Sequence, residues 1–272
     1  MDVLTTTRPE AGAWRTLPRL DRLGVLSALV GGTTLAWIYL FRLADGMTGA
    51  SIPMAAIQIR PWGAADFILI FLMWAIMMVG MMVPSAAPAV MIYAAIARKA
   101  ARDRTVVPPT VVFLSGYLAL WTAFCSVATL AQWGLDQAAL LSPMMVTTSP
   151  LIGSGLLIAA GVYQVTPVKR ACLKHCRSPA HFLAEHWHTG ISGAFRMGLE
   201  HAFFCLGCCW VLMGLLFVGG VMNLLWIAAI ATFVFAEKVI PLPDSPVPAR
   251  LTGGVMILAG LILGVTWAVG GG

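Results

Sequence analysis

Hydrophobic positions along this chain fall in long, nearly unbroken runs, and short polar segments separate these runs. A membrane-spanning helix needs about 20 predominantly apolar residues, and most of the runs reach that length. Seven runs follow one another, at 23–41, 66–97, 107–132, 151–166, 190–220, 224–238 and 251–269. The pattern therefore predicts an all-α fold, a polytopic transmembrane helix bundle of about seven spans.

The composition points to the same class of protein. Sixty per cent of the 272 residues are apolar and only ten per cent are charged. No segment of mixed polarity approaches the ~50 residues that an independent soluble core requires. We therefore expect a short cytoplasmic segment at 1–22, followed by a single transmembrane helical domain at 23–272.

The distribution of basic residues predicts an orientation in the bilayer. Assigned to alternate sides of the seven-span map, 15 of the 17 lysines and arginines lie on one side, and only Arg42 and Arg60 lie on the other. Because cytoplasmic loops carry the excess of lysine and arginine, this pattern predicts a cytoplasmic N-terminus. The net charge of +6 is explained by these loops, so we expect lipid and not nucleic acid as the surrounding partner.

The stretch 199–213 places an acid, a histidine and three cysteines inside an otherwise apolar helix. At about 100° per residue, His201, Cys205 and Cys208 fall within roughly 60° of one another, and Cys209 follows about 40° further round. Each of these side chains could be explained alone as packing or as a satisfied buried histidine. Four on one face of a membrane helix favour a metal-ligand or redox role, since ionisable groups are costly there.

A polar segment at 168–189 carries a second group of soft ligands. Cys172 and Cys176 are spaced i and i+4, and His175 stands beside the second cysteine. If the segment is helical, both sulfurs can reach one ion. The charge map places this Cys/His loop in the cytoplasm, where thiols stay reduced, so metal or redox chemistry is favoured over structural disulfides.

The second hydrophobic run contains a methionine stripe. Met73, Met77 and Met81 recur at i, i+4 and i+8, which places three thioethers on one face. Thioethers and thiolates are soft ligands that favour Cu(I). The alternative is that these methionines are flexible core filler, which is the commoner role of such a stripe. Pro84 and Pro88 lie further along the same run and free backbone carbonyls that must find other partners.

Several motifs together resemble a bacterial family of polytopic, predicted metal-binding integral membrane proteins, a domain of unknown function. They are Met-Trp-Ala-Ile-Met-Met-Val-Gly-Met-Met-Val-Pro at 73–84, Cys172 to Cys176 with Arg177 and Pro179, Cys-Leu-Gly-Cys-Cys-Trp-Val-Leu-Met at 205–213, and Glu237-Lys238. The resemblance covers about residues 66–238. It implies a membrane location and a bound metal, on the span-two methionines and on Cys172, Cys176, Cys205, Cys208 and Cys209.

The leading hypothesis is a non-enzymatic protein of the bacterial inner membrane that binds or moves a soft metal ion. Cu(I) is the favoured ion and zinc is the alternative. The expected partners are a metallochaperone or a membrane complex. Two other hypotheses stay open: a membrane thiol-disulfide oxidoreductase using Cys205 and Cys208, and a structural subunit whose cysteines only pack.

Overall fold

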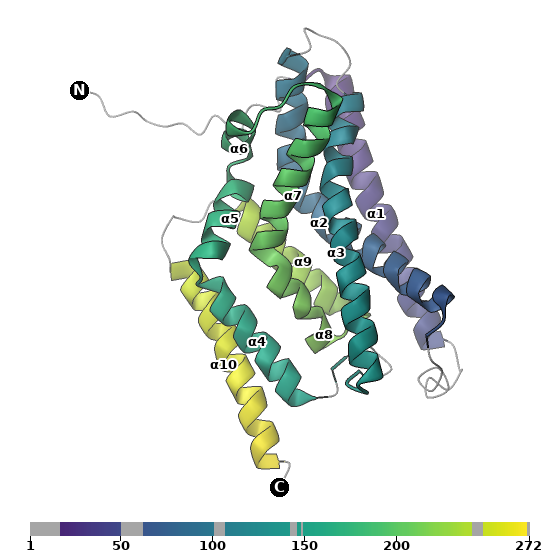
Figure 1. Ribbon diagram of the computed structural model, residues 1–272, viewed down its shortest axis with the longest axis vertical. Coiled ribbons are helices and arrows are strands. Elements are labelled where there is room, and N and C mark those ends of the chain that lie inside the picture. The colour runs from purple at the N-terminus through teal and green to yellow at the C-terminus, as the bar shows by residue number, and fades with distance from the viewer. Residues whose placement is uncertain are drawn as a thin grey trace, which may run out of the picture.

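The computed structural model describes residues 17–49, 62–100, 107–141, 146–147, 149–240 and 247–270. Its helices, labelled in Figure 1, are α1 (Arg19–Gly49), α2 (Ala64–Ala100), α3 (Val107–Gln137), α4 (Pro150–Gln164), α5 (Pro167–Arg177), α6 (Pro179–Glu185), α7 (Gly190–Gly214), α8 (Leu216–Gly219), α9 (Leu224–Val239) and α10 (Val247–Gly270). In the described part of the chain, one isolated bridge between Leu141 and Thr147 is the sole extended pairing. The all-α prediction is confirmed.

Each of the seven predicted runs contains one of the longer helices, but the helices differ in how well they fit a bilayer. Five of them, α1, α2, α3, α10 and α7 with α8, are long and apolar enough to span a membrane. Helix α9 has 16 residues, and α4 meets the same test only together with α5, from which it is bent by 66°. The count of seven spans and the orientation stay predictions. Residues 1–16 of the expected cytoplasmic segment lie outside the described residues.

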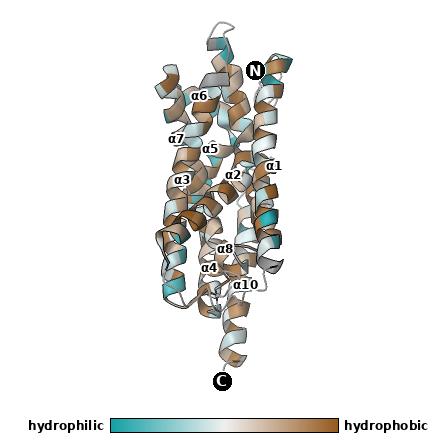
Figure 2. Ribbon diagram, turned by 90° about the vertical axis from the view of Figure 1, so that its right-hand side faces the viewer, coloured by the Kyte–Doolittle hydropathy of each residue, from teal (hydrophilic) through white to brown (hydrophobic). Residues whose placement is uncertain are grey.

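The helices form two groups (Figure 1). Helices α1, α2, α3 and α7 run side by side, with α9 behind α7, whereas α4 and α10 form a separate pair. Apolar residues colour most of the ribbon brown in Figure 2, and more teal appears toward the ends. Large apolar side chains such as Leu225, Val255 and Val269 are exposed, as expected of surfaces that face lipid.

Helices α3 and α7 touch through their backbones. A Cβ added at Gly116 would collide with the carbonyl of Phe195, and one added at Gly198 would collide with the carbonyl of Phe113. Small residues allow such close approach, which is how helices gain packing contacts in a bilayer. The glycine pair therefore fixes α3 against α7, and it places Tyr117, the neighbour of Gly116, over the face that carries the cysteines.

Pro84 leaves one backbone carbonyl of α2 free to bond outside the helix, as the sequence predicts. Pro84 lacks the N–H that would bond to the carbonyl of Gly80, and the Trp37 indole of α1 donates to that carbonyl at 3.3 Å instead. A second α2 carbonyl, that of Met82, accepts from the hydroxyl of Ser85. Helix α2 therefore offers hydrogen-bonding groups to its neighbours in the middle of an apolar bundle.

The segment 168–189, expected as a connecting loop, contains two short helices. Thr166 caps α5 by accepting from the backbone N–H of Lys169 at 3.2 Å, and Pro167 occupies the first turn. At the start of α6, Ser178 occupies the N-cap position and Pro179 is the first helical residue. Helix α5 packs along α7, so Cys172 and Cys176 are held on a helix next to the cysteines of α7.

The α3–α7 contact can be tested with two glycines of the same helix. We expect Gly116→Ala to lower the free energy of unfolding by about 1–3 kcal/mol, because the new methyl group meets the Phe195 backbone. Gly134→Ala is the matched control, since a Cβ there meets no atom of the described residues within 4 Å. Thermal unfolding in detergent, followed by tryptophan fluorescence, measures both variants. Equal stability of the two variants would contradict the backbone contact.

Candidate functional site

The predicted ligand face of α7 points into the bundle. Cys205, Cys208 and Cys209 are 1–2% exposed and His201 is 3% exposed, whereas Phe203 on another face is 65% exposed. The thiols of Cys208 and Cys209 both donate to the carbonyl of Cys205 at 3.0 Å. One turn of α7 therefore concentrates three sulfur atoms in an apolar interior.

Helix α5 adds further sulfur to this turn. The Cys176 side chain interacts with those of Cys205 and Cys208. Cys172 lies close to α7 at Gly207. A Cβ added to Gly207 would lie 2.7 Å from the Sγ atom of Cys172. The glycine between the cysteines of α7 is thus the residue that lets α5 approach. The two cysteine groups, separate in the sequence, form one thiol cluster, defined as Cys172, Cys176, Cys205, Cys208 and Cys209.

A buried lysine lies against this thiol cluster. Lys238 of α9 is 7% exposed, and its Nζ donates to Cys205 Sγ at 3.0 Å and to Ser85 Oγ at 3.1 Å. Tyr117 Oη is 3.0 Å from the same sulfur and donates to the Met82 carbonyl at 3.2 Å. Because Ser85 also donates to that carbonyl, at 2.9 Å, the five groups close a ring of polar contacts.

Sequence reasoning missed Lys238, Tyr117 and Ser85 as parts of the site. A signal was present for Lys238, since an ionisable residue in an apolar helix marks function. Glu237 and Lys238 are predicted from the sequence only to end a span and to form one motif of the resemblance. Tyr117 and Ser85 carry no such signal, because their role depends on contacts between distant helices.

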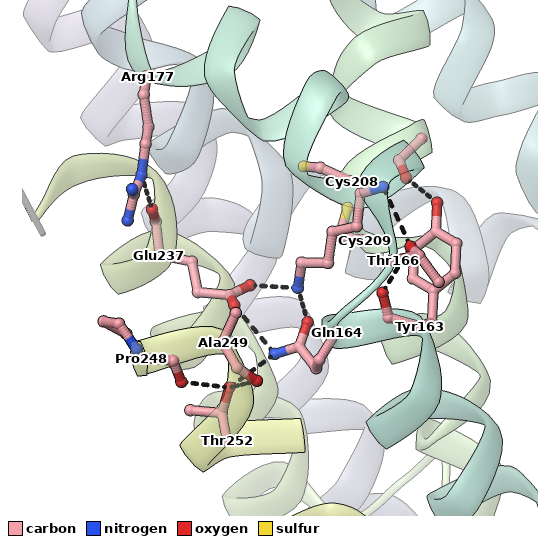
Figure 3. Close-up of polar contacts among 12 residues, drawn as sticks. Tyr163, Gln164, Thr166, Arg177, Cys208, Cys209, Glu237, Pro248, Ala249 and Thr252 are labelled. Carbon is pink, nitrogen blue, oxygen red and sulfur yellow. Dashed lines mark hydrogen bonds and ion pairs between the residues drawn. The ribbon is translucent and has the colours of Figure 1, made fainter. Parts of the chain in front are cut away.

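Glu237, the neighbour of Lys238, belongs to a second buried network (Figure 3). Lys169 of α5, 2% exposed, donates to Glu237 Oε2 at 2.7 Å and also to Gln164 Oε1. Gln164 Nε2 donates to Glu237 Oε1 at 2.9 Å, and Arg177 Nε donates to the Glu237 carbonyl at 2.7 Å. This network joins the ends of α4, α5 and α9, so it fixes the helix that carries Cys176.

The methionine stripe shares the buried core with the thiols. Met73, Met77 and Met81 are almost fully buried and pack in the same cluster as the cysteines of α7. Near one end of the stripe, the Met82 to Ser85 turn reaches Cys205 through Tyr117 and Lys238. At the other end, Trp74 packs on Phe217 with ring centroids 5.6 Å apart. The stripe therefore shares the bundle core with the α7 thiols, and Tyr117 and Lys238 link its Met82 to Ser85 end to Cys205.

The two predicted histidines differ in position. His201 lies one turn from Cys205 among the rings of Phe113, Tyr117 and Phe182, and its Nδ1 has no hydrogen-bond partner among the described residues. His175 stacks on Phe204 with ring centroids 4.1 Å apart, and its Nδ1 is 2.9 Å from the Ala171 carbonyl. His201 therefore adjoins the thiol cluster, whereas His175 packs on an aromatic ring beside it.

In the described part of the chain, no three histidine, cysteine or acidic side chains stand in an arrangement ready to hold a metal ion. The thiols instead bond to the Cys205 carbonyl and to Lys238. All six cysteines are free thiols. Chemically, the site offers soft sulfur donors beside one fixed positive charge.

The fold and these groups define a helical protein whose longest helices fit a membrane and whose buried core contains a thiol cluster. A family model described as PpoB2, copper chaperone, matches residues 71–263, which is more than half of the chain. The chain belongs to this copper chaperone family, which supports a copper-related function. No curated protein and no solved structure matches the chain.

The network around Glu237 can be tested by removing one charge. We expect Glu237→Gln to lower the free energy of unfolding by about 3 kcal/mol, because Lys169 would remain buried without a counter-charge. Glu200→Gln is the control, since it removes a partly exposed pair with the exposed Arg196, and pairs near the surface contribute less than about 1 kcal/mol. Denaturant unfolding in mixed micelles measures both. Equal losses would contradict a structural role for the buried pair.

Proposed function

We propose that this protein is an integral membrane copper chaperone that holds Cu(I) at its thiol cluster. In this proposal α1, α2, α3, α4, α7, α9 and α10 cross the bacterial inner membrane and the N-terminus is cytoplasmic. The distribution of basic residues supports this orientation, and the apolar character of the helices supports the location.

The ligands proposed for Cu(I) are Cys176, Cys205 and Cys208, with Cys172 and Cys209 beside them. Thiolates are soft ligands and select Cu(I) over harder ions. The meeting of an α5 thiol with the α7 thiols supports this choice, because two helices would then contribute to one ion. The thiols would turn away from the Cys205 carbonyl when they coordinate the ion.

The position of Lys238 is the observation that carries the proposal. Cu(I) held by the thiolates of Cys176 and Cys205, with Cys208 as a neutral thiol, has a net charge of one minus, and the Lys238 ammonium next to Cys205 balances that charge in a buried site. An unbalanced charge there would be costly. Zinc on two thiolates would be neutral and would leave Lys238 without a counter-charge, since the Glu237 carboxylate is engaged by Lys169. The charge balance therefore favours copper over zinc.

The methionines are proposed as weaker ligands along a transfer path. Met81, Met77 and Met73 would carry Cu(I) along α2, away from the thiol cluster, toward a receiving metallochaperone or membrane complex. His201, whose Nδ1 has no hydrogen-bond partner in the described part of the chain, lies one turn of α7 before Cys205. His175 and Cys172 lie on α5 at the proposed cytoplasmic side, where they would take part in receiving the ion.

Metal content tests the central site. We expect the full-length protein, purified anaerobically, to bind Cu(I), and the double variant Cys205→Ser/Cys208→Ser to bind it at least about tenfold more weakly, since two soft ligands are lost. Cys125→Ser is the control, because Cys125 is buried on α3 outside the thiol cluster. Competition with a chelator measures the affinity for copper and, in a parallel titration, for zinc. A folded double variant with unchanged copper affinity would contradict the proposal.

The transfer path makes a separate prediction. We expect the triple variant Met73→Leu/Met77→Leu/Met81→Leu to keep its Cu(I) affinity and its fold, since methionine and leucine have similar volume. Delivery of copper to a chelator trapped inside proteoliposomes would fall about tenfold, because the thioether steps are lost. Met78→Leu/Met82→Leu is the control, as these methionines are buried on the same helix outside the stripe. Equal delivery of copper by both variants would contradict a role of the stripe in transfer.

A further inference from the structure

A pocket opens beside the thiol cluster, at the junction of α5 and α6. Its volume is about 450 Å³, which is in the range of small-molecule sites. The walls come from α1, α2, the α5–α6 junction and α9. The lining residues that matter here are Ser85, Met91, Cys176, Arg177 and Lys238. Cys176 and Lys238 therefore face both this pocket and Cys205.

The charge of the pocket is positive. Among the described residues, Arg177 and Lys238 are the charged ones that line it, and both are basic. Arg177 Nε donates to the Glu237 carbonyl at 2.7 Å, which fixes the guanidinium at the pocket wall. The nearby Glu237 carboxylate is bound by Lys169 and Gln164, so its charge is balanced outside the pocket. An anionic ligand would find two fixed cations and one thiol in a mostly apolar cavity.

We propose that this pocket is the docking site for a Cu(I) complex of a small anionic thiol, such as glutathione. The proposal rests on the proposed copper function and names the form in which the ion arrives. The carboxylates of the complex would pair with Arg177, whose guanidinium suits bidentate contact with a carboxylate. The metal would then lie against Cys176, the thiol shared by the pocket and the cluster.

The transfer from this complex is a ligand exchange without oxidation or reduction. Cu(I) leaves two thiolates of the carrier and binds the sulfurs of Cys176 and Cys205. The two protons released by these cysteines go to the two departing carrier thiolates, which leave as thiols. Copper stays Cu(I), and the charge of the two-coordinate complex is one minus at the metal before and after the exchange.

The test compares two donors on the full-length protein in detergent under anaerobic conditions. One donor is Cu(I)–glutathione, which is anionic, and the other is Cu(I)–acetonitrile, whose ligand has no charge. We expect Arg177→Gln to load copper from glutathione at least about threefold more slowly, because one fixed cation is lost. Loading from Cu(I)–acetonitrile, which carries a positive charge, should not slow, and the final copper content should match that of the unmodified protein.

Two further variants separate charge from structure. Arg177→Lys keeps the positive charge but loses the Nε donor, so it should load from glutathione faster than Arg177→Gln. Arg170→Gln removes an exposed charge from the same helix outside the pocket lining and should leave both rates unchanged. Equal slowing of both donors by Arg177→Gln, or no slowing at all, would overturn the docking site. Binding of copper from neither donor by the unmodified protein would overturn the proposed function itself.

Discussion

The contact between Lys238 and Cys205 is the interaction on which the interior of this protein depends. A buried ammonium is costly unless its N–H groups find acceptors, and here a sulfur of α7 and a hydroxyl of α2 accept from it. The contact joins three helices at one point. The close contact of α3 with α7 at their glycines brings Tyr117 to the same sulfur. Helix α5, which begins at its Thr166 cap, brings Cys176 there. Local features of four helices are thus combined around one positive charge.

Adjacent residues on α9 serve two different networks. Because successive side chains on a helix are turned by about 100°, Glu237 faces α4 and α5 while Lys238 faces α2 and α7. Each charge therefore has a partner of its own, and the two do not neutralise each other. Lys169 therefore neutralises Glu237, and Lys238 serves the thiol cluster.

The sequence predicts features that depend on helical periodicity. The positions of the long helices, the inward face of α7 and the i, i+4 spacing of Cys172 and Cys176 all follow from local pattern. The approach of α5 to Gly207 and the ring through Tyr117, Ser85 and Lys238 do not, because they join residues far apart in the chain. Copper could be inferred from the softness of sulfur, whereas the charge that favours a monovalent ion required the packing of α9 to be known.

The bend between α4 and α5 determines where Cys176 lies relative to α7. Cys176 lies about ten residues beyond this bend, hence ~15 Å from it along α5 at 1.5 Å per residue. A rotation of ~15° at the bend would carry its sulfur by ~4 Å, farther than a coordination bond can stretch. The angle between α4 and α5 therefore sets the distance between Cys176 and the cysteines of α7, and Lys169 and Arg177 hold this angle through their contacts with Glu237.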